Sequence, residues 1–294
     1  MELKYTVKEI KYSNVKEVLK VFFGISDRLL TKLKKSNKIY FNGTPTYVHH
    51  PLSLNDTITV NLDFEEESEN ILPKKMDLNI IFEDEALLVI NKKPNTPVHP
   101  SILHFEDSLS NGVKFYFDKL NLKRKIRPVN RLDKDTSGIV IFAKNEYIQE
   151  ALIRQMKTKV FRKEYLAILT GHLEKNIGTI NAPISRKENS IIEREINKNG
   201  EISITHFELI KNFVKNDEEL SLVKFILETG RTHQIRLHSK FIGHPILGDT
   251  LYGFPSKLIS RQSLHAYKVS FIHPLTKEIL ELEIPLPNDM NNII

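Results

Sequence analysis

One polar stretch organises this sequence: Arg131-Leu132-Asp133-Lys134-Asp135-Thr136-Ser137-Gly138, followed directly by the apolar run 139–143. A short apolar run rich in β-branched residues predicts a buried strand. Acids and bases in a loop at a strand end commonly form functional sites. The neighbouring cations favour the ionised carboxylate of Asp133, which suits a nucleophile or a base. The alternative is that Asp133 or Asp135 only caps a turn.

Short strands and a few helices are expected on both sides of this stretch. Residues 78–82 and 87–91 indicate a strand–turn–strand, and Asn145 is a good N-cap for a helix. Further strands are expected at 164–169, 220–227 and 266–271, with a hairpin turning at Asn199-Gly200. Because strands outnumber helices and hairpins join many of them, we predict an α+β fold with a mixed, largely antiparallel sheet.

Residues 1–62 predict a small N-terminal domain. Apolar residues at helical spacing indicate a helix over 15–22, and a second helix follows Ser26. Asn42-Gly43 is typical of a tight turn between two strands, and residues 57–60 alternate as a further strand. The second helix and its exit carry only cations after Asp27, which indicates a solvated face or a phosphate-binding surface: Arg28, Lys32, Lys34, Lys35 and Lys38.

An acidic run separates this unit from the rest of the chain. Residues 63–70 contain five acids, and Pro73 follows. Such a composition predicts a solvated linker, because charged residues cannot bury themselves cheaply. We therefore expect a linker at 63–75 and a large domain at 76–288.

Composition excludes several classes of protein. The chain of 294 residues has no cysteine, which excludes disulfides, thiolate nucleophiles and cysteine-based metal sites and suits a reducing cytoplasm. No apolar run is long enough to predict a membrane span. No glycine-rich loop follows a strand, which argues against a Rossmann or P-loop nucleotide site. The 43 basic and 37 acidic residues leave a net charge of +6, too small to identify a partner.

Three further polar clusters follow or precede predicted strands. Residues 229–238 contain two histidines and two arginines; a metal site is disfavoured there, because the glutamate of the zinc-protease motif is missing. Lys163-Glu164-Tyr165 opens an apolar strand, where a tyrosine usually serves packing. Lys92-Lys93-Pro94 lies in a loop before His99.

Taken together and in order, these motifs resemble the RluA/RluC/RluD-type pseudouridine synthases. Residues 131–138 match the R-L-D-x-x-T-S-G motif of that family, and four further matches follow: Lys163-Glu164-Tyr165, Gly230-Arg231-Thr232-His233-Gln234-Ile235-Arg236, Gly243-His244-Pro245-Ile246-Leu247-Gly248-Asp249 with Tyr252-Gly253, and Leu264-His265-Ala266 with His273-Pro274. The sequence departs from the family at Asn130, where the family has histidine, and at Lys93-Pro94-Asn95-Thr96-Pro97, where it has K-P-x-G. Residues 25–58 resemble the small RNA-binding domain first seen in ribosomal small-subunit protein four.

The resemblance implies the isomerisation of uridine to pseudouridine within RNA, without a cofactor or a metal. It makes Asp133 the essential carboxylate, Arg231 its ion-pair partner, and Tyr165 the residue that stacks on the base and removes the C5 proton. The target uridine would flip out of its helix, and Arg131 would occupy the space it leaves or grip the neighbouring phosphate. The RNA contacts expected are Arg131, Arg127, Lys125, Arg124, Lys34, Lys35 and Arg28.

The expected partner is RNA, with ribosomal RNA favoured and transfer RNA as the alternative. We expect a cytoplasmic monomer without a membrane anchor. Two other functions stay open at this level. A non-catalytic RNA-binding factor would use the same basic residues, and an RNA glycosidase would need paired carboxylates, for which Asp135 offers no matching role.

Overall fold

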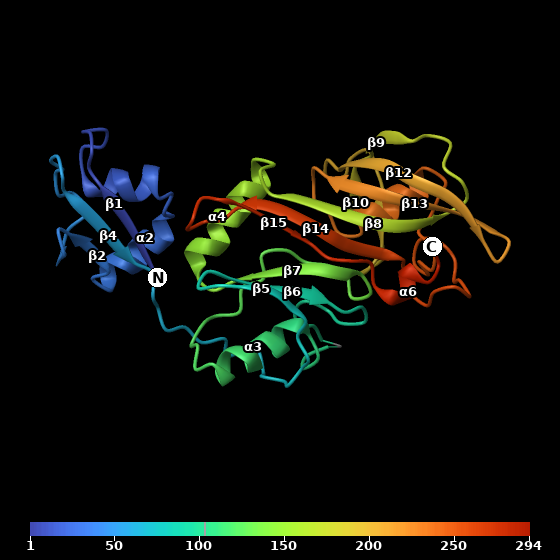
Figure 1. Ribbon diagram of the computed structural model, residues 1–294, viewed down its shortest axis with the longest axis horizontal. Coiled ribbons are helices and arrows are strands. Elements are labelled where there is room, and N and C mark those ends of the chain that lie inside the picture. The colour runs from blue at the N-terminus through green and yellow to red at the C-terminus, as the bar shows by residue number, and fades with distance from the viewer. Residues whose placement is uncertain (103) are drawn as a thin grey trace.

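The chain forms a small N-terminal sheet and a large sheet that makes up most of the molecule (Figure 1). The computed structural model describes residues 1–102 and 104–294. The small sheet contains, in spatial order, β1 (Glu2–Thr6), β4 (Thr57–Asn61), β2 (Ile39–Phe41) and β3 (Thr44–Pro45). All of its pairings are antiparallel.

Two helical segments cover this small sheet, as the sequence predicts. The first comprises α1 (Val15–Glu17) and a π-helical turn, η1 (Val18–Phe22); the second is α2 (Asp27–Lys35). The hydroxyl of Ser26 accepts a hydrogen bond from the Leu29 N–H at 3.2 Å and so caps α2. The turn at Asn42-Gly43 and strand β4 are also confirmed, whereas β1 was not predicted.

The large sheet is mixed and largely antiparallel, so the predicted α+β class is confirmed. It contains, in spatial order, β5 (Ile80–Glu83), β6 (Leu87–Lys92), β7 (Ser137–Ala143), β14 (Leu264–Ile272), β8 (Arg162–Thr170), β13 (Glu218–Leu227), β12 (Ile204–Lys215) and β9 (Ile177–Asn181), with β15 (Ile279–Glu283) also paired to β14. Only β7 and β14 run parallel within the part of the chain described. A separate ribbon pairs β10 (Ile184–Arg186) with β11 (Arg194–Ile196).

Helices cover both faces of the large sheet. Helix α3 (Leu109–Lys119) and helix α5 (Gln234–Phe241) pack on one face, and α4 (Glu146–Lys157) packs on the other. Strands β6 and β7 alternate between two cores: Val140 and Phe142 face the α3 side, while Ile139 and Ile141 face the α4 side. Because both faces are covered, the central residues of both strands, 87–90 and 139–143, are apolar. A short helix, α6 (Asn288–Asn291), lies near the C-terminal end.

The predicted hairpin at Asn199-Gly200 is wrong. The chain does turn there, but β11 pairs with β10, and β12 pairs with β9 and β13. Gly200 passes so close to Ile184 that a Cβ atom on it would lie 2.5 Å from the Ile184 carbonyl carbon. The glycine is therefore needed because two backbone segments cross closely here. An Asn-Gly pair is also typical of a hairpin turn, so the sequence alone does not distinguish the two cases.

The acidic segment 63–70 is not a fully solvated linker, which corrects the prediction. The Glu66 carboxylate lies between Lys32 Nζ at 2.6 Å and Arg127 Nη1 at 2.9 Å, and its side chain is only 15% exposed. Asp63 pairs with Arg124 at 2.8 Å. Acids that looked unpaired in the sequence are thus neutralised by cations from both sides. The segment joins the N-terminal unit to the large one through ion pairs.

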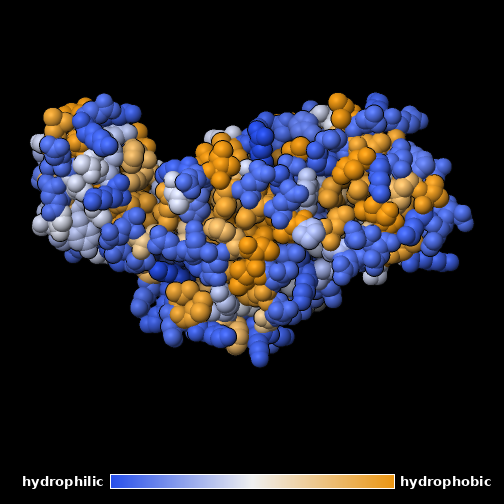
Figure 2. All heavy atoms as spheres, in the orientation of Figure 1, coloured by the Kyte–Doolittle hydropathy of each residue, from blue (hydrophilic) through white to orange (hydrophobic). Residues whose placement is uncertain are grey.

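Helix α4 supplies the other contacts of the N-terminal unit, and Figure 1 shows the two side by side. Ser26 donates a hydrogen bond to Glu150 at 2.9 Å, and Arg28 lies 3.2 Å from Glu146. On the face shown in Figure 2 the outline is mainly hydrophilic, and hydrophobic residues gather toward the middle of the large unit. No helix among the residues described is long and apolar enough to cross a bilayer.

Candidate active site

Asp133 lies in the loop that enters β7, and two buried cations hold the main chain of this loop. The buried Lys92 ammonium donates to the Lys134 carbonyl at 2.8 Å, and also to the carbonyls of Lys93 and Thr96. Arg261 donates to the Asp135 carbonyl at 3.0 Å. These bonds fix the main chain at the two residues that follow Asp133, and so position the Asp133 side chain.

The entry into β7 also requires a glycine. Gly138 has φ +122°, and a Cβ atom there would lie 2.3 Å from the Ala266 carbonyl oxygen. At this point β7 crosses β14 in the parallel pairing, and no other residue fits. Gly138, the last residue of the polar stretch, therefore allows β7 to approach β14 closely. This approach positions the residues at the start of the stretch, including Asp133.

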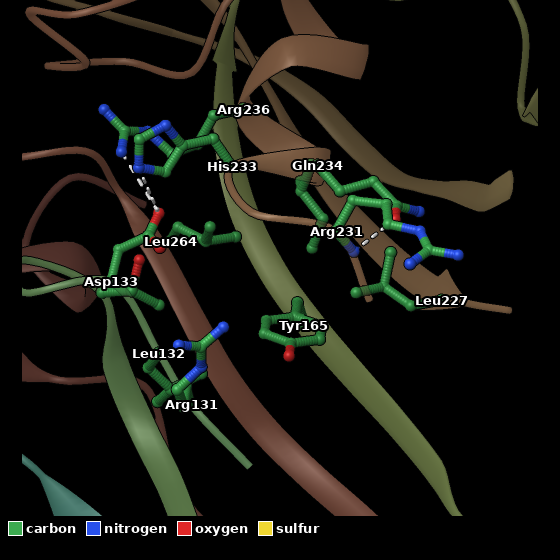
Figure 3. A pocket seen from close by; sticks show the side chains of 12 residues that line it. Arg131, Leu132, Asp133, Tyr165, Leu227, Arg231, His233, Gln234, Arg236 and Leu264 are labelled. Carbon is green, nitrogen blue, oxygen red and sulfur yellow. Dashed lines mark hydrogen bonds and ion pairs between the residues drawn. The ribbon is translucent and has the colours of Figure 1, made fainter. Parts of the chain in front are cut away.

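The ion-pair partner of Asp133 is Arg236. Its Nη1 lies 3.2 Å from Asp133 Oδ2, as the dashed line in Figure 3 shows. The same guanidinium holds Asp249 in a two-pronged pair, with Nε at 2.7 Å and Nη2 at 2.8 Å. Arg236 is 8% exposed and Asp249 is 1% exposed. Hydrogen bonds from Arg236 lower the pKa of Asp249, although burial opposes this, and both carboxylates raise the pKa of Arg236.

His233 and Tyr252 complete this side of the site. His233 Nε2 lies 3.9 Å from Asp133 Oδ2, and His233 Nδ1 lies 2.9 Å from the Tyr252 hydroxyl. Burial lowers the pKa of His233, while the nearby Asp133 opposes that shift. The Arg236 guanidinium lies over the Tyr252 ring at 5.2 Å, a cation–π distance. Arg236 is therefore held on two sides, by Asp249 and by Tyr252.

Arg231 does not pair with Asp133, which corrects the pairing that the family resemblance implied. It precedes α5, and its guanidinium forms an ion pair with Glu201 and donates to the Ile202 carbonyl at 3.3 Å. Figure 3 places Arg231 beside Leu227, on the opposite side of the site from Asp133. The reason is helix geometry, because Arg236 projects inward from α5, whereas Arg231 lies in the turn before the helix. Arg231 still lines the cleft.

Tyr165 projects from β8 into the site and is 6% exposed. Burial raises the pKa of its phenol, and the neighbouring Asp133 adds to that effect. The phenol is therefore neutral at ordinary pH. Asp133 and Tyr165 line the same cavities, one of about 70 Å³ shared with Arg236 and His233, and a wider cleft of about 520 Å³.

Asn130 has a structural role where the family has histidine. Its amide nitrogen donates to the Ile139 carbonyl at 2.9 Å, and its amide oxygen accepts from the Ile141 N–H at 2.9 Å. The side chain is buried and bridges two residues of β7. The amide group therefore bonds one backbone carbonyl and one backbone N–H, and it does not titrate.

The predicted RNA-contacting residues fall into two groups. Arg131, Lys125, Lys34 and Lys35 have exposed side chains, and Arg28 is exposed although it pairs with Glu146. Arg131 lies at the cleft with Asp133. These positions leave their charges open to a phosphate.

Arg124 and Arg127 are engaged within the protein, contrary to the expectation of free phosphate contacts. Arg124 binds Asp63 and the Phe64 carbonyl, the latter at 2.7 Å. Arg127 is buried against Glu66. In this conformation an RNA phosphate would have to displace a carboxylate to reach either guanidinium.

Sequence reasoning missed four residues that build the site: Lys92, Arg236, Asp249 and Arg261. Arg236 and Asp249 do lie within the quoted motifs, and Lys92 lies in a quoted loop. A signal existed for Arg236, because it lies three residues after His233 on the predicted helix, where side chains share a face. No local signal links Arg261 with the Asp133 loop, since their contact spans 126 residues.

Fold and site together define a class of protein. A partly exposed carboxylate is held by a buried arginine, a neutral tyrosine lines the same cavity, and the exposed Arg131 and Arg231 line the cleft. This arrangement suits an enzyme that acts on a polyanion bearing a base that must enter a cavity.

Comparison with known proteins identifies the family. Residues 86–240 match the model of the RNA pseudouridylate synthase family. The chain is 40% identical over 272 residues to an uncharacterized RNA pseudouridine synthase, YjbO, of Bacillus subtilis, covering 92% of this chain and 95% of that one. It is 35% identical to the ribosomal large subunit pseudouridine synthase D of Blochmanniella floridana, covering 78% and 75%. The structure of human RNA pseudouridylate synthase domain containing 1 matches with a TM-score of 0.59 at 26% identity, covering 71% and 83%.

This chain therefore belongs to the RNA pseudouridine synthase family, as the sequence motifs predicted. It is an isomerase that acts on RNA. The pseudouridine synthase fold is shared with the human protein.

Proposed function

We propose that this RNA pseudouridine synthase modifies uridines in large-subunit ribosomal RNA. Relatives at 31–37% identity carry the name ribosomal large subunit pseudouridine synthase D, which supports that choice. The N-terminal unit, which resembles a ribosomal RNA-binding domain, supports it too. Transfer RNA is the alternative substrate.

The proposed chemistry rests on one observation: Asp133 forms an ion pair with Arg236, and Tyr165 lines the same cavity. In pseudouridine formation the N1–C1′ bond breaks, the uracil turns, and a C5–C1′ bond forms. Asp133 is the reacting carboxylate in this proposal, and Arg236 directs one of its oxygens. The base must leave its stack to reach Asp133, so the target uridine flips out. Unstacking the base costs about a few kcal/mol.

Tyr165 supports the flipped base. Its ring borders the cavity at Asp133, so a uracil can stack on it. The phenol is neutral, because burial raises its pKa, so in this proposal it relays the proton: its oxygen takes up the C5 proton as its own hydroxyl proton passes to water. Deprotonation at C5 comes after bond cleavage, so the hydroxyl acts late in the reaction.

RNA contacts surround this site in the proposal. Arg131 lies at the cleft and takes the space that the flipped uridine leaves. Residues 1–62 form an RNA-binding domain whose exposed Arg28, Lys34 and Lys35 contact phosphates. Arg124 and Arg127 contact the RNA only if a phosphate displaces Asp63 from Arg124 or Glu66 from Arg127. We further propose that the protein acts as a monomer in the cytoplasm.

The test is a map of pseudouridines across total RNA from cells that lack this protein. Loss of defined pseudouridines in large-subunit ribosomal RNA, restored by the wild type and not by Asp133→Asn, supports the proposal. Loss only in transfer RNA overturns the choice of substrate. Release of free uracil from a uridine-containing transcript would instead indicate a glycosidase.

A further inference from the structure

Lys163 is a cation of the cleft that the chemistry above does not use. It lies on β8 two residues before Tyr165, so both side chains project from the same face of the strand. Both line the cleft of about 520 Å³ that contains Asp133. The Lys163 ammonium reaches across toward the loop before α5, where a Cβ atom on Gly230 would lie 3.5 Å from Nζ.

The carboxylates of this cleft are already paired with other cations. Asp133 binds Arg236, and Glu228 binds Lys159 and His206, the latter at 2.6 Å. Among residues 1–102 and 104–294, no carboxylate pairs with Lys163. Burial lowers its pKa, with no opposing charge. A partly desolvated cation without a counter-ion is unfavourable, and an incoming anion removes that cost.

The position of Lys163 indicates which part of the RNA supplies the anion. The small cavity at Asp133 is lined by Tyr165, His233 and Arg236 and does not include Lys163. Lys163 lines the wider cleft together with Met156 and Phe161. A flipped nucleotide places its base in the small cavity and its sugar–phosphate in the wider one.

We propose that Lys163 binds the backbone phosphate that adjoins the target uridine and so holds the flipped nucleotide in register with Asp133. The proposal rests on the RNA pseudouridine synthase function and adds one specific contact to it. Lysine suits this role as a compact point charge on a long stem. Arg131 and Arg231 line the same cleft, but Arg231 is paired with Glu201 and Arg131 is exposed.

The test combines a protein variant with a substrate variant. Lys163→Met, Lys163→Arg and the control Lys119→Met are assayed on a short RNA that the wild type modifies, whether from ribosomal or transfer RNA. Lys119 is exposed at the end of α3 and lies outside the cleft lining. In matched RNAs, a methylphosphonate replaces either the 5′ or the 3′ phosphate of the target uridine.

We expect Lys163→Met to raise KM about tenfold with kcat within about twofold, and to lower the salt slope of RNA binding by about 0.7–0.9. Lys163→Arg restores most of the loss, and Lys119→Met changes nothing. One of the two methylphosphonates raises the wild-type KM by the same factor and has no further effect in Lys163→Met.

Three outcomes overturn the proposal. The first is a loss in kcat alone with an unchanged salt slope, which would place Lys163 on the base. The second is additive losses from Lys163→Met and both methylphosphonates. The third, which does not depend on the folding of a variant, is a wild-type KM unaffected by either methylphosphonate. If the wild type modifies only transfer RNA, the choice of ribosomal RNA fails while Lys163 is still tested.

Discussion

Asp133 and Asp249 share one arginine: Arg236 lies 3.2 Å from Asp133 through Nη1 and 2.7 Å from Asp249 through Nε. The buried Asp249 takes the two-pronged pairing, which fixes the plane of the guanidinium. The remaining N–H groups then point at the more exposed Asp133. The Asp133 carboxylate is thus oriented by an arginine that is itself oriented by a second carboxylate.

Asp133→Asn should abolish pseudouridine formation and leave RNA binding intact. The amide keeps the shape of the side chain but loses its charge, so activity falls by about 10²–10⁴-fold or more. Tritium release from C5-labelled uridine RNA measures the reaction, and filter binding measures affinity. Near-normal turnover by the folded variant would contradict the role of Asp133.

Arg236→Lys and Arg231→Lys form a matched pair that tests the ion-pair assignment. Arg236→Lys loses the two-pronged contact with Asp249, so kcat should fall at least about 10-fold, and removal of the charge in Arg236→Ala should cost about 3–5 kcal/mol of stability. Arg231→Lys should keep kcat within about threefold and change mainly KM. The opposite ranking in single-turnover assays would restore Arg231 as the partner of Asp133.

Tyr165→Phe should bind RNA normally and fail to complete the isomerisation. The ring that stacks on the base remains, whereas the oxygen that accepts the C5 proton is lost, and product formation falls by about 10²–10⁴-fold. The wild-type phenol has its pKa raised above the ordinary value near 10, so it stays protonated from about pH 6 to 9. Its titration therefore adds no step to the pH–rate profile in that range, and a step lost on mutation would count against this account.

Lys92→Met should change how stability depends on pH. Burial lowers the pKa of Lys92 to about 7, while the unfolded value is about 10.4. Between these values the unfolded chain binds more protons, so Lys92 makes the free energy of unfolding rise with pH, by up to about 1.4 kcal/mol per pH unit. Below pH 7 both states hold the proton and the contribution is constant.

Urea unfolding of the wild type and of Lys92→Met at several pH values measures this difference. The variant also removes one hydrogen bond to each of three carbonyls, which should cost about 1–3 kcal/mol and loosen the Asp133 loop. The stability difference should grow from pH 7 upward in favour of the wild type. A difference that does not vary with pH would mean that Lys92 keeps its ordinary titration.

The double charge reversal Lys34→Glu and Lys35→Glu tests the N-terminal unit in the intact chain. If both lysines contact phosphates, the slope of log K against log salt should fall by about 2, with kcat unchanged. Lys119→Glu is the control, because Lys119 is exposed outside the cleft lining. An unchanged salt slope would remove this surface from the RNA interface.

The family and the chemistry could be predicted from the sequence because they rest on short contiguous motifs. Residues 131–138 place a carboxylate at a strand entry, and Lys163-Glu164-Tyr165 opens the strand that carries Tyr165 into the site. Periodicity likewise predicted the main helices and strands, since each depends on neighbours within one element. The α+β class followed from their order.

Only the tertiary structure decided which charges meet. Arg231 and Arg236 stand five residues apart, and the pairing with Asp133, 103 residues from Arg236, depends on which of them α5 turns inward. Glu66 looked solvated until the fold placed Lys32 and Arg127 on either side of it. The physical reason is that a local pattern fixes the face of an element on which a side chain lies, whereas an ion pair depends on how separate elements pack. The motifs of the sequence therefore identify the family, whereas the contact between Asp133 and Arg236 forms only when the loop before β7 and helix α5 come together.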